Sequence, residues 1–265
     1  MLTLEWQDRQ KIGILRMQDK VNVLTVDLRD KIREIFEQHI YINPQYRHMK
    51  ALVITGMSGA GTQKTFSAGA SLFEIREAIS RLMEENESPI RTFLSGGHEF
   101  MKMFYSHSLR MRTFATFAII GGAGAFGGGL ELALSCNRCI GIRGSTVSFP
   151  EAFFGMLPGW GGTIRTFNKV SYAHYINLIE HSARVSVEEA FNMNLLDDIF
   201  DSEDAAIEYI ASLDADKMER ITREARVCHP VDIDQEIKNF IHRVKLVGIQ
   251  NVIANITAFL KKKEG

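Results

Sequence analysis

Two glutamates in apolar surroundings could move a proton beside a carbonyl group. Glu131 and Glu151 lie in GLELAL and FPEAFF. Burial disfavours the charged form of a carboxyl group, so we expect raised pKa values and one proton held near neutral pH. Such a pair can act as an acid and a base. The structural alternative makes Glu131 a charge at a helix N-terminus and Glu151 a helix cap.

Two glycine-rich turns could stabilise the negative charge that this proton transfer creates. Residues 127–129 are all glycine and precede a predicted helix, where bare backbone N–H groups favour an anion. Residues 68–70, Ala-Gly-Ala, follow a separate predicted strand and open another helix. If folding brings the two turns together, they form an oxyanion hole for a carbonyl that becomes an enolate.

Two stretches resemble nucleotide-binding motifs but lack features that these motifs require. Residues 122–127 satisfy GxGxxG, but Glu131 would place a carboxylate near the bound pyrophosphate, and no acidic residue ends the next strand. In the stretch 56–65, GMSGAGTQKT, Lys64 comes two residues too late for a phosphate-binding loop. We therefore expect neither a dinucleotide site nor a P-loop.

Composition and charge exclude several classes of protein. The 265 residues carry 32 acidic and 31 basic side chains, so a strongly basic nucleic-acid surface is not expected. A hydrophobic fraction of 45% argues against disorder. No apolar run reaches the roughly 20 residues that cross a bilayer, and the first ten residues do not look like a signal peptide. We expect a cytoplasmic enzyme or binding protein without a membrane partner.

The cysteines do not predict a metal site. Cys136 and Cys139 form a CxxC pair, but Cys228 is distant and there is no second pair to complete four zinc ligands. The pair lies in an apolar stretch, so buried and unreactive thiols are expected.

Alternating strands and helices place the chain in the α/β or mixed class. Residues 2–7 and 11–18 predict a hairpin, and Thr25 is expected to cap the following helix. Further helices are predicted at about 71–87 and in the Met-rich segment 89–112. The other predicted strands are 50–56, 114–120, 139–144, 146–149 and a short edge at 195–200.

The chain becomes mostly helical after Ser186, and no linker separates this part from the core. The last predicted helix carries an apolar stripe at helical spacing, made of Leu246, Ile249, Ile253, Ile256 and Phe259. We divide the chain into a core at 1–200 and a helical region at 201–265.

Three stretches in this order resemble the signatures of the crotonase (enoyl-CoA hydratase/isomerase) superfamily. They are FSAGASLFEI at 66–75, GAFGGGLELALSC at 124–136 and FPEAFFGMLPGWGGTIRTF at 149–167. VNVL at 21–24 matches an early turn of the family, and 183–200 matches the segment after its core. The combination is far more specific than any one glycine motif.

The resemblance implies a crotonase-like spiral of ββα units with a C-terminal helical region that forms trimers, often paired into hexamers. Members bind acyl thioesters of coenzyme A and stabilise a thioester enolate, and no other cofactor is implied. By position, the resemblance implies that the backbone N–H groups of Ala70 and Gly128 would form the oxyanion hole. The residues implied in CoA or substrate binding are Ala68, Gly69, Gly127, Trp160 and Lys262.

Hydratases of the family hold a water molecule between two glutamates, at the positions of Glu131 and Glu151. There Glu131 would help activate water for attack on the β-carbon, and Glu151 would exchange the proton at the α-carbon. Many isomerases, hydrolases and decarboxylases of the superfamily lack one of the two, so the pair favours an enoyl-CoA hydratase.

The sequence departs from the family pattern at three places. Ser71 stands where the family usually has Asp, so the contact that this Asp makes at the helix start is not predicted here. The usual Lys-Pro before the central strand is absent, and the Asn-Gly that often follows that strand reads GGA. The stretch between the two oxyanion turns is longer than in short-chain hydratases, within the segment that lines the acyl pocket in the family. An acyl group other than crotonyl, long or bulky, is therefore expected.

Other interpretations stay open at this point. The same fold could catalyse hydrolysis, isomerisation or dehydration of a thioester on CoA or on a carrier protein, or it could bind acyl-CoA without turnover. An NAD-dependent dehydrogenase is the remaining alternative. Lys262 could contact the CoA nucleotide or be a solvated cation that matches the helix dipole.

Overall fold

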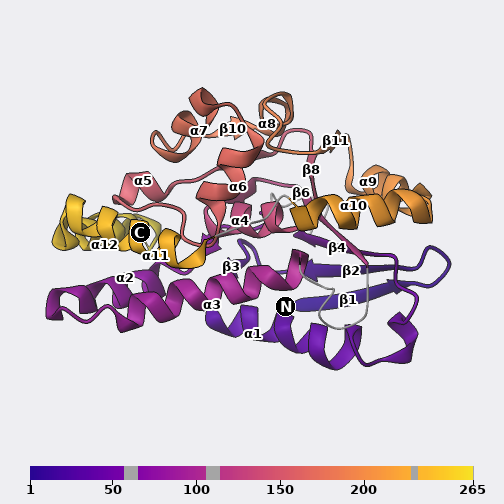
Figure 1. The fold of residues 1–265 in the computed structure, drawn as a ribbon, viewed down its shortest axis with the longest axis horizontal. Helices are drawn as coiled ribbons and strands as arrows, with labels where there is room; N and C mark the ends of the chain where they lie inside the picture. Colours follow the sequence, from indigo (N-terminus) through magenta and orange to yellow (C-terminus); the bar gives the residue numbers. More distant parts are fainter. Residues whose placement is uncertain (57–64, 106–113, 228–231, 265) are drawn as a thin grey trace.

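The computed structural model describes residues 1–56, 65–105, 114–227 and 232–264. One sheet of six strands organises the molecule, in the order β1-β2-β4-β6-β8-β11 (Figure 1). β1 pairs antiparallel with β2 as the predicted hairpin, and the other neighbours in this sheet are parallel. The strands are β1 Leu2–Gln7, β2 Ile12–Met17, β4 Ala51–Gly56, β6 Ala115–Ile120, β8 Arg138–Ile142 and β11 Asp198–Phe200.

Short strands follow the large ones and create the spiral. β3 pairs with β5, and β7 pairs with β9, in both cases in parallel. Each turn therefore gives one strand to the large sheet, one to a small sheet and then a helix, which confirms the predicted ββα units. The short strands are β3 Val23–Leu24, β5 Gly69–Ala70, β7 Gly124–Phe126, β9 Thr146–Ser148 and β10 Val185–Ser186. The helices of these turns are α1 Val26–Glu34, α2 Leu72–Ser80, α4 Gly128–Ser135 and α5 Glu151–Phe154.

The inner strands β4 and β6 are buried on both faces because they are almost continuously apolar. Along β4, Leu52 and Ile54 join the main core, whereas Ala51 and Val53 face the second core. The second core is closed by apolar residues of α9 and α10. In Figure 1 these two helices lie at the other end of the molecule from α11 and α12. The remaining α-helices are α3 Ser88–Tyr105, α6 Gly162–Lys169, α7 Tyr172–Ile179, α8 Val187–Asn192, α9 Glu203–Ser212, α10 Ala215–Val227, α11 Ile233–Val247 and α12 Ile249–Glu264.

Two predicted helix starts are confirmed by capping. The Thr25 side chain accepts a hydrogen bond from the N–H of Leu28 at the start of α1. The Ser71 side chain accepts one from the N–H of Glu74, so serine caps α2 where the family usually has Asp. The predicted Met-rich helix is confirmed over Ser88–Tyr105, the range of α3, and the rest of that prediction lies outside the described residues.

The predicted stripe on the last helix is wrong at its first position. Leu246 belongs to α11, and its side chain is 72% exposed. Gly248 has φ +97°, a conformation that favours glycine, and it separates α11 from α12. Within α12, Val252 and Ile256 are the fully buried positions. The two cysteines of the CxxC pair are buried free thiols, as predicted, and Cys228 lies outside the described residues.

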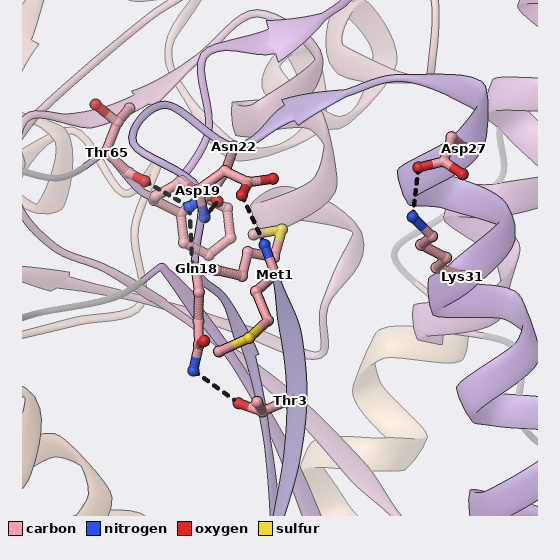
Figure 2. A network of polar contacts seen from close by, with 10 residues as sticks. Met1, Thr3, Gln18, Asp19, Asn22, Asp27, Lys31 and Thr65 are labelled. Atoms are coloured by element: carbon pink, nitrogen blue, oxygen red, sulfur yellow. Dashed lines mark hydrogen bonds and ion pairs between the residues drawn. The ribbon is translucent and has the colours of Figure 1, made fainter.

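A buried asparagine ties the N-terminal turn to the loop before β5 (Figure 2). Nδ2 of Asn22 donates to the carbonyl oxygens of Thr65 at 2.9 Å and Phe66 at 3.1 Å. Oδ1 of Asn22 accepts from the N–H of Asp19 at 2.8 Å. This side chain is buried together with Thr65 and Phe66, so the two carbonyl groups do not have water as a substitute partner.

Asn22→Ala is expected to destabilise the protein by about 3 kcal/mol, because it leaves buried backbone groups without partners. Urea unfolding would measure the loss, with Asn239→Ala on the exposed face of α11 as the matched control. Equal midpoints for the two variants would contradict this role for Asn22.

Candidate active site

Folding brings the two glycine-rich turns together, which is the condition for a shared oxyanion hole. A Cβ atom on Gly69 would lie 3.0 Å from the backbone nitrogen of Gly128. A Cβ atom on Gly128 would lie 3.1 Å from the backbone nitrogen of Ala70. The N–H of Phe126 donates to the carbonyl oxygen of Ser67 at 3.0 Å and joins the two segments just before the turns. The nitrogens of Ala70 and Gly128 are therefore close neighbours.

The position of Gly128 suits an oxyanion donor. It is the first residue of α4, so its N–H has no acceptor within the helix and lies at the positive end of the dipole. The preceding Gly127 has φ +50°. Gly69 has φ +92°, and a side chain there would also strike the carbonyl oxygen of Phe126. Glycine is required in both turns because they approach each other this closely.

Glu131 lies in the first turn of α4 and is only 2% exposed. Its Oε1 accepts hydrogen bonds from the N–H of Trp160 at 2.7 Å and the N–H of Gly162 at 2.8 Å. Gly162 is the first residue of α6, so the carboxylate also faces a helix N-terminus. Glu131 is therefore a charge at a helix N-terminus, as the structural alternative states, and it is also a buried acceptor held by another turn.

Glu151 is the first residue of α5, and its side chain makes no capping hydrogen bond. The interpretation as a helix cap is therefore wrong. Its Oε1 would be 2.5 Å from a Cβ atom on Gly127, which places the carboxyl group beside the oxyanion turn. Its Oε2 is buried and has no hydrogen-bond partner among the described residues. An oxygen in this position is available to a ligand or to water.

Burial raises the pKa of both carboxyl groups. The pKa of Glu151 rises to about 8. The pKa of Glu131 rises well above its ordinary value because of burial, then the nearby charges of Glu151 and Glu236, against the two backbone N–H donors. Glu131 has two N–H donors from a neighbouring turn that favour its ionised form, whereas Glu151 has only its own backbone N–H. Near neutral pH we therefore assign the negative charge to Glu131 and the proton to Glu151.

The raised pKa of Glu151 predicts a pH-dependent stability. The folded state keeps its proton up to about pH 8, whereas the unfolded chain releases it near 4.5. Between these values the free energy of unfolding should fall as pH rises, by up to about 1.4 kcal/mol per pH unit. Glu151→Gln removes this group, so its stability should depend less on pH in that window. Urea unfolding at several pH values tests this, and parallel curves for wild type and variant would contradict it.

Trp160 forms a wall against the oxyanion turn. Its six-membered ring lies 2.8 Å from the position of a Cβ atom on Gly128. On its other side, a Cβ atom on Gly97 of α3 would lie 1.8 Å from Nε1 of Trp160, so the indole fits only because residue 97 is glycine. The guanidinium of Arg29 lies 5.1 Å from the Trp160 ring centroid, and the Phe93 ring lies 5.4 Å from it. The Met-rich helix α3 therefore borders the predicted site.

The other predicted contact residues lie at different distances from this centre. Ala68 donates its N–H to the carbonyl oxygen of Val21 at 2.8 Å, directly before the first oxyanion turn. Lys262 is exposed near the end of α12. The Phe259 ring, one turn earlier, packs on Phe154 of α5 at 5.4 Å. The structure thus places the end of α12 against the helix that Glu151 begins, and the role of Lys262 stays a prediction.

Four buried ionisable residues near the site were not singled out from the sequence. They are Arg29 on α1, His98 on α3, Arg165 on α6 and Glu236 on α11. A charged residue within an amphipathic helix is ordinarily solvated, so the sequence carries no local signal that these side chains point inward.

An open hollow of about 530 Å³ lies elsewhere, lined by Lys50, Phe114 and Thr222 among others. It borders the starts of β4 and β6, whereas the oxyanion turns follow the opposite ends of these strands. We therefore identify the site by its chemistry and not by the size of this hollow. Within the described ranges, no three His, Cys, Asp or Glu side chains gather as metal ligands, and no helix there is long and apolar enough to span a membrane.

Known proteins resemble this chain in sequence and in fold. An ethylmalonyl-CoA decarboxylase from Xenopus laevis is 24% identical over 192 residues, which is 72% of this chain but only 56% of that protein. The chain thus matches about half the length of this relative. Two solved structures share the fold. DspI from Pseudomonas aeruginosa is 24% identical, with 98% of this chain and 94% of that one covered and a TM-score of 0.69. An enoyl-CoA hydratase from Bacillus halodurans is 17% identical, with 97% and 99% covered and a TM-score of 0.73.

The family model for enoyl-CoA hydratase/isomerase matches residues 7–229, which is most of the chain. The fold, the paired glycine turns and this match agree. The protein belongs to the enoyl-CoA hydratase/isomerase family of the crotonase superfamily.

Proposed function

We propose that the protein is an enoyl-CoA hydratase, which adds water across the double bond of a 2-enoyl-CoA thioester. One observation carries the proposal: the carboxyl group of the buried Glu131 and that of Glu151, whose Oε2 is buried, lie beside the turn that presents the Gly128 N–H. Hydration needs a base for water and an acid for the α-carbon, and these two groups supply both.

In the proposed reaction, the thioester oxygen accepts hydrogen bonds from the N–H groups of Ala70 and Gly128. The ionised Glu131 takes a proton from water as the water oxygen bonds to the β-carbon. The electron pair of the double bond moves toward the thioester oxygen, where the two N–H groups stabilise the enolate. Glu151 then gives its proton to the α-carbon. Water has been added, and the proton now on Glu131 returns to Glu151 to restore the starting state.

The substrate class follows from the same site. The acyl part would pass Trp160, whose indole lies on the oxyanion turn, and would meet α3. The nucleotide part of CoA is polyanionic and needs local cations on a chain of net charge −1. Lys262 is the proposed contact, because α12 packs on the helix that begins with Glu151. A homotrimer or a homohexamer is the proposed assembly, and the proposed location is the cytoplasm.

Mass spectrometry of the products would test the proposal. The purified protein is incubated with 2-enoyl-CoA thioesters of several chain lengths. A product that gains one water and keeps its thioester identifies hydration, whereas loss of CoA identifies hydrolysis and loss of carbon dioxide from a carboxylated acyl-CoA identifies decarboxylation. Binding of acyl-CoA without turnover on any of these thioesters would contradict the proposal.

A further inference from the structure

A third buried carboxyl group lies behind the proposed site and takes no part in the reaction above. Glu236, on α11, is 3% exposed. Its Oε1 accepts a hydrogen bond from the hydroxyl of Thr163, on α6. Its Oε2 lies 2.9 Å from Nε2 of His98, on α3, which is 2% exposed. Burying a carboxylate costs free energy unless the charge is paired. A cluster of this kind, built from α3, α6 and α11, therefore calls for a functional explanation.

The cluster holds the turn that binds Glu131. The two backbone donors to Glu131 come from Trp160 and Gly162, and Thr163 follows Gly162 directly. At the other end of the turn, Nη1 of Arg165 donates to the carbonyl oxygen of Trp160 at 2.8 Å. Buried side chains thus anchor this turn at both ends.

We propose that Glu236 is a positioning residue for Glu131. By accepting the Thr163 hydroxyl, it holds the first turn of α6 so that the Gly162 N–H keeps its place against the Glu131 carboxylate. The proposal deepens the proposed hydratase function and rests on it. It also gives α11, within the C-terminal helical region, a direct part in the chemistry of the core.

Besides holding the turn that binds Glu131, Glu236 acts on Glu131 through its negative charge. After burial and the charge of Glu151, the nearby charge of Glu236 raises the pKa of Glu131. The charged and titratable groups around Glu131 are Glu151 from α5, Glu236 from α11 and Arg165 from α6. From α3, His98 faces Glu236, and the Tyr105 ring lies 5.3 Å from the guanidinium of Arg165. Removing the Glu236 carboxylate should therefore make Glu131 a weaker base.

Three variants separate positioning from mere packing. Thr163→Val removes the hydroxyl and should lower kcat by about tenfold with little change in KM, because a small displacement of a catalytic group is costly. Thr163→Ser keeps the hydroxyl and should restore the activity. Glu236→Gln should lower the apparent pKa of Glu131, seen in the pH profile of kcat/KM, by about one pH unit. Asp234→Asn, an exposed carboxylate on the same helix, is the control.

A measurement without substrate keeps this test separate from that of the reaction. The infrared band of protonated carboxyl groups is followed against pH, and Glu131→Gln assigns the component that belongs to Glu131. We expect this component to titrate at lower pH in Glu236→Gln than in Asp234→Asn. If Glu236→Gln and Asp234→Asn give the same infrared titration, the positioning role is overturned, even if the protein hydrates enoyl-CoA. If the infrared difference is found but no 2-enoyl-CoA gains water, the hydratase proposal fails and the link between Glu236 and Glu131 stands.

Discussion

Glu151→Gln is expected to lower kcat for hydration of a 2-enoyl-CoA by about 10³-fold, because a positioned acid contributes on this order. Glutamine has nearly the same shape but carries no proton that it can give to the α-carbon. KM should change little, since the thioester oxygen is held by the backbone N–H groups of Ala70 and Gly128. Steady-state kinetics with the thioester that the wild-type protein hydrates fastest would measure both constants.

The pH profile adds a second measurement to this prediction. In the wild-type protein, activity should decline as pH rises past about 8, where Glu151 loses its proton. This decline should be absent from the residual activity of Glu151→Gln. Glu208→Gln, an exposed position on α9, is the matched control and should behave as wild type. Full turnover by Glu151→Gln would remove Glu151 from the mechanism.

Much of the fold was predictable because local chemistry and the final structure agree. The central strands β4 and β6 are apolar runs of the length that a sheet buried on both faces requires. Thr25 caps α1 as its residue type predicts. Leu246 shows where apolar periodicity fails to predict the structure. The apolar spacing continues across Gly248, but the glycine ends one helix there, and a periodic pattern alone does not reveal the break.

The site was predictable where backbone conformation determines residue type. Gly69 and Gly127 have positive φ angles and lie at close approaches, so their glycine pattern marks the two turns. The contact between Thr163 and Glu236 joins residues 73 positions apart and depends on how α11 packs against α6 and α3. No local signal distinguishes Glu236 from a solvated helix residue, so only the fold could reveal it.

In the proposed mechanism Glu131 is the base, and it also accepts the hydrogen bonds that hold the neighbouring turn. Its replacement should separate these two roles. Glu131→Gln removes the base, so kcat should fall by about 10³-fold. The amide oxygen of glutamine can still accept from the N–H groups of Trp160 and Gly162, so the turn should stay in place. Kinetics and urea unfolding, with Glu208→Gln as the control, would separate these effects. Loss of the fold together with the activity would mean that Glu131 acts mainly as a structural anchor.

The variant that carries both Glu131→Gln and Glu151→Gln tests whether the two carboxyl groups act as one unit. If they serve the same water and the same enolate, removing the second should cost little after the first is gone. We expect the double variant to lose about 10³- to 10⁴-fold in kcat, close to the worse single variant. Independent roles would instead multiply to about 10⁶-fold, from two factors of about 10³. A loss of that size would show that Glu131 and Glu151 act in separate steps and contradict a shared water molecule.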